Sequence, residues 1–287
     1  MGRRNDADAV SGIKLYHRIF PYLMTKRSDA FVYYSVTIDM TKSLQFIRRR
    51  NMHAGEHKYQ LFTVIAAALV RTIALKPALN RFVSGHRYWQ RRELSFNFVV
   101  KQSYSETGAQ RNAVVRCEPD MTFEEIAALM RNAVSQARND DESREERALA
   151  AFFRLPHPLR RLLLNVLRGL DTVGRYPKSL GQIDGLHASA FIANLGSIGL
   201  PSPLMHHLYN WGTTSLFVSF GRLERSRDGY RESGTMEFGF TIDERIAEGY
   251  YFMRSVKLFQ YFLENPHMLE QPPDLSEATD PGGEASP

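Results

Sequence analysis

The segment from Leu61 to Leu75 is apolar around almost its whole circumference, and it ends where Lys76 precedes Pro77. A helix with one apolar stripe can lie on a protein surface, whereas a helix that is apolar on every side has to be covered on every side. Proline ends a helix because it lacks a backbone N–H and restricts the residue before it. The sequence therefore predicts a buried helix over 61–75. A chain of 287 residues with 43% hydrophobic content can supply the core that covers it.

Aromatic and β-branched residues between Phe31 and Asp39 predict a β-strand, because such side chains fit a pleated, half-buried surface. Further strands are predicted at 94–100, 113–117, 214–221 and 238–242, and at the start of 189–199. Helices are predicted after Thr41, after Thr122 and over 250–263. Glu125 follows Thr122 by three residues, which is the pattern of a capping box. Strands interspersed with helices predict an α/β protein with a single domain.

The predicted domain runs over 15–268, after an N-terminal arm over 1–14 and with a helical insert at about 140–180. The last residues, 269–287, are rich in proline, glycine, serine and acidic residues, and they predict a disordered tail. The first eight residues are polar and lack the apolar core of a signal peptide, and no run is long enough for a transmembrane helix. These features lead us to expect a cytoplasmic protein.

The chain carries 37 Lys and Arg against 31 Asp and Glu, a formal net charge of +6. The excess is mostly scattered arginine without a nucleic-acid-binding motif, so we expect no nucleic-acid partner. The same positive charge is equally compatible with a small anionic ligand, such as one that carries phosphates. Cys117 is the only cysteine, which excludes an intrachain disulfide and indicates a structural thiol in a reducing compartment. His206 and His207 have no second pair of ligands near them in the sequence, so no metal site is predicted.

Leucines and a valine recur at helical spacing over 148–174, with arginines between them. Pro156 and Pro158 predict that this segment forms two helices. A basic amphipathic helix can lie on an anionic membrane surface or dock a partner protein. Packing of the segment on the protein's own sheet is the third and simplest alternative, and it is the one that we expect.

The stretch from Phe238 to Tyr250 combines a predicted buried strand, a charged turn and the start of a helix. The turn contains Asp243, Glu244 and Arg245. A strand end holds a side chain rigidly at the rim of a sheet, which is a common place for catalytic groups.

Three short segments then occur in a familiar order. The predicted buried helix ends in Pro77-Ala78-Leu79-Asn80, the 192–199 turn reads Ile-Ala-Asn-Leu-Gly-Ser-Ile-Gly, and 243–249 reads Asp-Glu-Arg-Ile-Ala-Glu-Gly. They resemble the Pro-x-Leu-Asn, Ile-Ser-Asn-Leu-Gly-x-x-Gly and Asp-His-Arg-x-x-Asp-Gly patterns in the catalytic domain of the dihydrolipoamide acyltransferases of 2-oxoacid dehydrogenase complexes. That family shares its fold with chloramphenicol acetyltransferase. The resemblance implies a mixed β-sheet flanked by helices and a homotrimer with active sites between subunits.

The resemblance also marks two positions where the chemistry differs. The family's histidine, the general base for the thiol of coenzyme A or dihydrolipoamide, is replaced by Glu244, and the motif's aspartate is replaced by Glu248. Ala193 stands where the family has a serine or threonine that donates a hydrogen bond to the oxyanion. Losing one such donor typically costs about 10²–10³ in rate. A carboxylate is also a poor base for a thiol unless burial raises its pKa by several units.

Two hypotheses follow from these differences. In the first, the protein is a non-catalytic oligomeric binding or scaffold protein. In the second, it is an active coenzyme A-dependent acyltransferase that uses Glu244 as general base, with Glu248 beside it and with Asn194 or Ser197 supplying the polar contact that Ala193 lacks. Coenzyme A or an acyl thioester is the implied ligand, and Asp243, Arg245 and Gly249 are expected to brace the turn.

Overall fold

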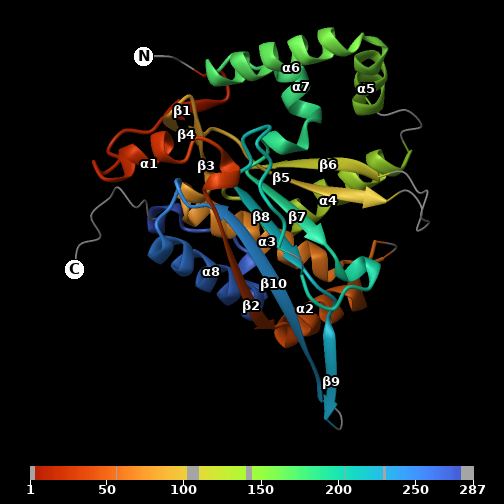
Figure 1. Ribbon diagram of the computed structural model, residues 1–287. Coiled ribbons are helices and arrows are strands. Elements are labelled where there is room, and N and C mark those ends of the chain that lie inside the picture. Colours follow the sequence, from red (N-terminus) through yellow and green to blue (C-terminus); the bar gives the residue numbers. More distant parts are fainter. Residues whose placement is uncertain are drawn as a thin grey trace.

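A computed structural model describes residues 4–55, 57–101, 110–139, 144–203, 205–228 and 231–278 (Figure 1). Its main feature is a mixed sheet of seven strands, six of them in the order β2-β10-β8-β7-β5-β6 and the seventh, β9, paired with β10. These strands are β2 (Phe31–Asp39), β5 (Leu94–Lys101), β6 (Gln110–Cys117), β7 (Ala190–Asn194), β8 (Leu216–Phe220), β9 (Glu224–Asp228) and β10 (Arg231–Asp243). The predicted α/β domain with a mixed sheet is confirmed.

The centre of the sheet is parallel and its edges are antiparallel. Strands β5, β7 and β8 run in one direction, while β6, β10 and β2 pair in the opposite sense to their neighbours. All five residues of β8 are buried, as a strand covered on both faces requires. In this register Ala193 lies beside Ser219, and Ser219 lies beside Gly239. The register sets the positions of the functional groups described below.

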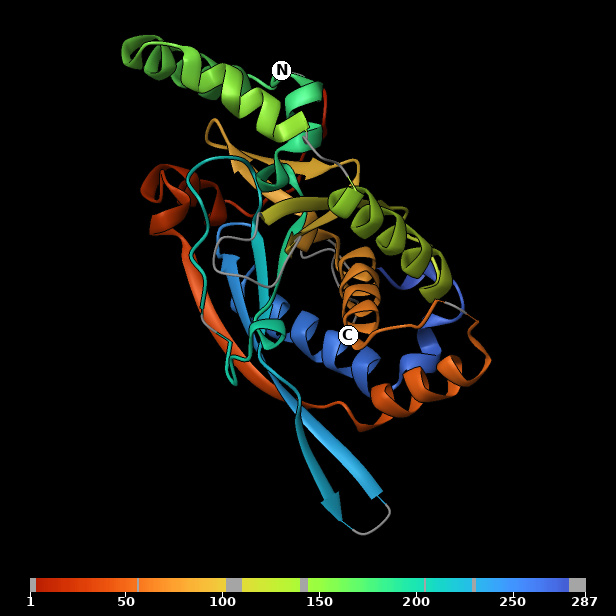
Figure 2. The ribbon, with the colours of Figure 1, turned by 90° about the vertical axis from the view of Figure 1, so that its right-hand side faces the viewer.

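Four helices form a layer on one face of the sheet (Figures 1 and 2). They are α2 (Thr41–His53), α3 (Leu61–Leu75), α4 (Phe123–Asn139) and α8 (Gly249–Glu264). Helix α3 lies in the middle, and twelve of its fifteen residues are buried, which confirms the buried helix predicted from its sequence. At the start of α4, Thr122 donates its backbone N–H and its hydroxyl to the carboxylate of Glu125, at 2.8 and 2.7 Å.

The N-terminal arm takes part in a second, smaller sheet in the order β1-β4-β3. It consists of β1 (Ala7–Ala9), β3 (Arg81–Ser84) and β4 (Arg87–Arg91). Two short elements follow the arm, α1 (Phe20–Leu23) and the 3-10 turn η2 (Arg27–Asp29). Ala7, Phe82 and Trp89 form the buried core of this small sheet, so the arm is part of the folded body.

The insert forms α5 (Arg144–Arg154), α6 (His157–Thr172) and α7 (Lys178–Ile183), followed by the 3-10 turn η4 (Gly185–His187). The division into two helices at Pro156 and Pro158 is confirmed. Helices α5 and α6 extend away from the sheet (Figure 2), and none of the residues of α6 is buried. Phe153 and Leu162 remain 62% and 59% exposed. The expectation that this segment packs on the protein's own sheet is therefore wrong.

The chain after α8 continues to pack on the rest of the protein beyond residue 268, where the predicted domain ends. It forms the 3-10 turns η6 (Pro266–Leu269) and η7 (Leu275–Glu277). Leu269 is buried, and Arg71 of α3 donates to the carbonyl of Gln271 at 2.6 Å. Leu269, the first residue of the predicted disordered tail, thus fills part of the core, and residues 279–287 of that tail lie outside the described residues. Among the helices of the described ranges, none is long and apolar enough to cross a membrane.

Candidate functional site

A cavity of about 1020 Å³ opens at the carboxyl ends of the parallel strands β5 and β7. Ligands of open α/β sheets bind at these strand ends. The apolar part of its wall includes Phe98 of β5, Phe191 of β7 and Phe217 of β8. Phe191 and Phe217 stack at 4.7 Å, and His206 stacks on Phe217 at 4.3 Å, so His206 packs on this aromatic wall.

The polar part of the cavity wall is basic. Within the part of the chain that the structure describes, its charged residues are cations from the segment before α3, from β5 and from α4, namely Lys58, Lys101, Arg131 and Arg138. Glu124 lies just outside the lining and accepts a hydrogen bond from the hydroxyl of Tyr59 at 2.8 Å. Burial, followed by this hydrogen bond, raises the pKa of Tyr59. The wall therefore favours a ligand with an apolar part and negatively charged groups.

The turn after β7 supplies three of the residues singled out in the sequence, and all three line this cavity: Ala193, Asn194 and Ser197. Asn194 and Ser197 bind each other, because the backbone N–H of Ser197 donates to Oδ1 of Asn194 at 3.0 Å and its hydroxyl donates to the carbonyl of Asn194 at 2.7 Å. Both side chains therefore hold the 3-10 turn η5 (Gly196–Ile198) in place. A Cβ on Gly196 would lie 2.6 Å from the carbonyl oxygen of Gly221, so this position requires glycine.

The turn after β10 holds Glu244 between two buried, paired residues. Arg245 donates from Nε and Nη2 to the two carboxylate oxygens of Asp243, at 2.7 and 2.5 Å. Nη1 of Arg245 also donates to the carbonyl of Met24 at 2.7 Å. Asp243 and Arg245 brace the turn, while the side chain of Glu244 is exposed.

Glu248 and Gly249 lie at the start of α8. The carboxylate of Glu248 pairs with His17 at 3.0 Å and with Lys14 at 3.3 Å, so it connects α8 to the end of the N-terminal arm and to the residues just after it. Gly249 is exposed, and a Cβ built there would meet nothing within 4 Å.

Glu244 and Ala193 lie at opposite ends of the sheet within one chain. Ala193 is level with Gly239, and Glu244 follows Gly239 by five residues along β10 and its turn. At ~3.4 Å per residue, this separates the two levels by roughly 17 Å. One chain therefore does not bring Glu244 to the cavity that Ala193 lines.

Comparison with solved structures places this architecture among known folds. A probable dihydrolipoamide acetyltransferase from Listeria monocytogenes 4b F2365 aligns over 90% of this chain and 94% of its own, with a TM-score of 0.58 and 10% identity. The cubic core of the pyruvate dehydrogenase multienzyme complex aligns over 88% of both chains, with a TM-score of 0.57 and 14% identity. A chloramphenicol acetyltransferase aligns over 90% of this chain and 99% of its own, with a TM-score of 0.57 and 11% identity.

The chain has the acyltransferase fold of these proteins. The resemblance noted in the sequence is confirmed at the level of the fold. No protein-family model and no curated protein matches the sequence. Within the acyltransferase fold, the cavity wall carries a methyl group at Ala193, and the exposed carboxylate of Glu244 lies at the far end of the sheet.

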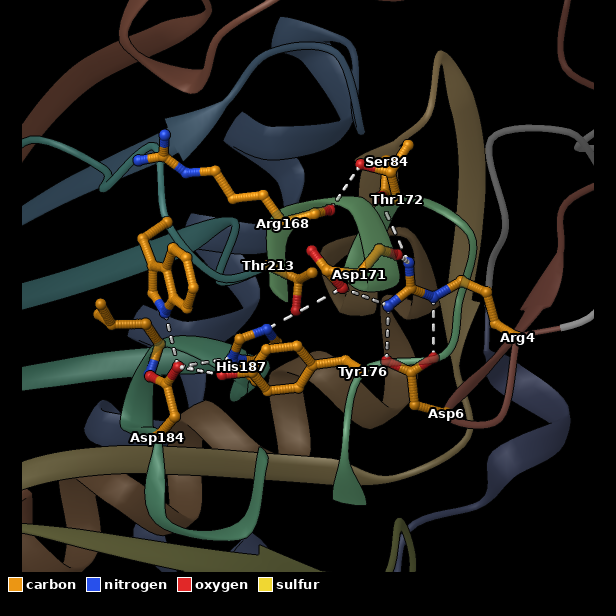
Figure 3. A network of polar contacts seen from close by, with 12 residues as sticks. Arg4, Asp6, Ser84, Arg168, Asp171, Thr172, Tyr176, Asp184, His187 and Thr213 are labelled. Atoms are coloured by element: carbon orange, nitrogen blue, oxygen red, sulfur yellow. Dashed lines mark hydrogen bonds and ion pairs between the residues drawn. The ribbon is translucent and has the colours of Figure 1, made fainter. Parts of the chain in front are cut away.

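A polar network joins the N-terminal arm to the end of α6, and sequence reasoning did not find it (Figure 3). The guanidinium of Arg4, which has no exposed side-chain surface, pairs with Asp6 at 2.8 Å and with Asp171 at 2.7 Å. Burial alone would lower the pKa of Arg4, but the hydrogen bonds that it donates to the carboxylates of Asp6 and Asp171 raise it. Arg4 and Asp171 are separated by 167 positions. No local pattern relates residues so far apart.

The same network continues to Asp184 and His187 (Figure 3). Asp184 Oδ2 lies 3.0 Å from Nδ1 of His187 and accepts a hydrogen bond from Nε1 of Trp211 at 2.7 Å. Burial alone would raise the pKa of Asp184, but the contacts with His187 and the indole N–H outweigh it and hold that pKa below its usual range. Tyr176 stacks on His187 at 4.3 Å. These contacts fix the chain between α7 and β7. Within the described ranges, no three histidine, cysteine or acidic side chains are grouped as metal ligands would be.

Proposed function

We propose that this chain is a non-catalytic, oligomeric binding protein that takes coenzyme A or an acyl thioester into the cavity beside β7. The observation that carries the proposal is Ala193. It lines the cavity with a methyl group at the position where the resemblance to the acyltransferases implies a hydroxyl donor. A methyl group donates no hydrogen bond to an oxyanion, and the loss of one such donor typically costs about 10²–10³ in rate.

The chemistry of the cavity supports this class of ligand. Its volume of about 1020 Å³ lies at the upper end of the range of roughly 300–1,000 Å³ found for small-molecule sites. Lys58, Arg131 and Arg138 provide positive charge for phosphates, because guanidinium and ammonium groups form charge-assisted hydrogen bonds with phosphate oxygens. The aromatic wall provides an apolar surface for an acyl chain.

An active acyltransferase with Glu244 as general base is the alternative. It requires a neighbouring subunit to bring its own Glu244 to this cavity, because Glu244 lies at the opposite end of the sheet. Even then, Asn194 and Ser197 are hydrogen-bonded to each other, and Ala193 still lacks a donor.

The test measures binding and turnover separately. We expect acetyl-coenzyme A to bind in isothermal titration calorimetry, without acyl exchange to a thiol above the uncatalysed rate. Lys58→Gln and Arg138→Gln should each weaken binding, while Lys257→Gln, at an exposed position on α8, should not. Turnover that is present in the wild type and absent in Glu244→Gln would refute the non-catalytic proposal. Absence of saturable acetyl-coenzyme A binding would refute the proposal that the cavity binds coenzyme A or an acyl thioester.

The oligomer we propose is a homotrimer. Strand β2 pairs only with β10 among the described strands, so its other edge is available for a neighbour. Val32, Tyr33 and Tyr34 on this strand are 37%, 47% and 41% exposed, an apolar group typical of subunit contacts. Light scattering after size exclusion should give the mass of three chains. Tyr33→Asp should lower that mass, while Tyr250→Asp should not; a monomeric wild type would contradict the proposal.

The insert is the second surface that we assign to a partner, and we assign it to an anionic membrane surface. Exposed apolar residues on α5 and α6 include Phe153, Leu162 and Val166. The guanidinium of Arg160 lies over the ring of Phe153 at 5.5 Å, and Arg154 is exposed at the end of α5. A helix with a basic side and an exposed apolar side binds anionic lipid in two ways, by burial of its apolar side chains and by attraction of its cations to the headgroups.

A further inference from the structure

A second cavity, of about 300 Å³, lies where the insert meets the body. Its wall is contributed by the end of α6, by the turn between β3 and β4, by η2 and by residues 210–212. The Glu244 side chain and the aromatic wall beside β7 do not belong to it, so it is separate from the cavity proposed for the acyl thioester.

Arg27 is the central feature of this cavity. It is 7% exposed, and Nε is buried without a hydrogen-bond partner. Among the described residues, the one hydrogen bond of its guanidinium runs from Nη1 to the carbonyl of Tyr209 at 3.4 Å, a weak contact. Within the described chain no carboxylate pairs with Arg27. Burial, with Arg245 and Arg4 nearby adding positive charge, lowers the pKa of Arg27 to about 10, although Asp243 opposes this change. A buried cation without a partner is costly unless an anion compensates it.

The charges around Arg27 show what the cavity lacks. Asp171 lines it but is already paired with Arg4, and Arg245 lines it but is already paired with Asp243. Lys26 and Arg168 also line it, both are exposed, and within the described residues neither side chain forms an ion pair. Arg168 lies over the ring of Trp211 at 5.8 Å, which keeps its guanidinium beside the cavity. Among the residues that the structure describes, no carboxylate thus compensates Arg27, Lys26 or Arg168.

The cavity walls are held in place by the surrounding contacts. Gly85 and His86 form the two-residue turn between β3 and β4, and both have positive φ, 58° and 59°. A Cβ on Gly85 would lie 3.1 Å from the carbonyl oxygen of Thr172, so this turn packs closely on the end of α6. The Arg4–Asp171 pair fixes the same end of α6 to the body. The site is therefore built from rigid elements on both sides.

We propose that this cavity binds a small molecule that carries a phosphate group, with Arg27 at the buried end and Arg168 and Lys26 at the exposed end. A phosphate dianion balances more of the three charges than a single carboxylate does. The planar donors of the two arginines suit phosphate oxygens. A volume of about 300 Å³ is at the small end of ligand sites, so the rest of the molecule is small.

The proposal is tested with inorganic phosphate, glycerol 3-phosphate and acetate, each titrated at constant ionic strength set with sodium chloride. We expect phosphate and glycerol 3-phosphate to raise the thermal unfolding midpoint saturably, with half-saturation at a concentration at least about tenfold lower than for acetate. An effect of acetate at the same concentrations would overturn the assignment to phosphate, and the absence of any saturable effect would overturn the site.

Variants locate the binding. Arg168→Gln should weaken phosphate binding roughly tenfold, because an ionised hydrogen-bond partner is lost. Arg161→Gln, on the same helix, exposed and outside the cavity, should leave it unchanged. Arg27→Met should remove the saturable effect of phosphate on the unfolding midpoint. If Arg27→Met does not fold, the comparison of Arg168→Gln with Arg161→Gln decides whether phosphate binds in this cavity. Equal effects of Arg168→Gln and Arg161→Gln would overturn the proposal.

Discussion

Arg245 donates two hydrogen bonds to Asp243, two residues before it, and both side chains are almost fully excluded from solvent. Asp243→Asn keeps the shape of the side chain but leaves the guanidinium of Arg245 buried without a countercharge. Breaking a buried ion pair on one side typically costs about 3–5 kcal/mol. We expect a loss of this size in the free energy of unfolding, measured by urea denaturation.

Glu244→Gln is the matched control for this prediction, because Glu244 lies in the same turn and its side chain is exposed. An exposed substitution of this kind changes stability by no more than about 0.5 kcal/mol. Equal losses in the two variants would show that the turn is not stabilised by the Asp243–Arg245 pair.

Arg4→Met should destabilise the protein by a similar amount, about 3–5 kcal/mol, because it leaves Asp6 and Asp171 without their shared partner. The effect should be largest at the insert, since Arg4 also donates to the backbone carbonyl of Asp171 at 2.5 Å. Hydrogen exchange followed by mass spectrometry should show faster exchange over 157–172. Arg18→Met removes an exposed arginine and should leave both the stability and this exchange as in the wild type.

Acid should destabilise the protein in part through Asp184. Its folded pKa lies below the unfolded value of 3.8, so the unfolded chain binds the proton more readily. The stability that this group contributes is therefore fully present above pH 3.8 and is lost as the pH falls below that value toward the folded pKa.

The measurement is the free energy of unfolding in urea between pH 5 and pH 2.5. We expect it to fall less steeply in Asp184→Asn than in the wild type. Asp120→Asn removes an exposed carboxylate and serves as the control. A slope in Asp184→Asn that equals the wild-type slope would contradict the assigned role of Asp184.

The elements that the sequence predicts correctly are those with a local cause. The range of α3 follows from its continuous apolar run and from Pro77, and β2 coincides with its aromatic and β-branched run. The turn at Gly196 follows from a short motif. In each case the deciding residues lie within one element.

The sites that the sequence does not predict join residues from distant elements. The cavity around Arg27 needs η2, the end of α6 and the β3–β4 turn at once. The Arg4–Asp171 pair joins the arm to the insert across 167 positions of the sequence. The apolar face of α6 was recognised in the sequence, but an amphipathic pattern does not specify what the face contacts, and here the face is exposed.

The exposed face of α5 and α6 gives the last prediction, which concerns binding to lipid. We expect the protein to co-sediment with vesicles containing phosphatidylserine and less with vesicles of phosphatidylcholine alone, because arginines beside the apolar face are attracted to anionic headgroups. Binding should fall when salt is raised to about 0.5 M, since salt screens exposed charges. Phe153→Ser together with Leu162→Ser should abolish sedimentation without unfolding the protein, because both side chains are exposed. Leu15→Ser is the control, since Leu15 is 82% exposed but lies outside the insert. If the double variant sediments with anionic vesicles as well as the wild type does, the insert does not bind membrane through this face.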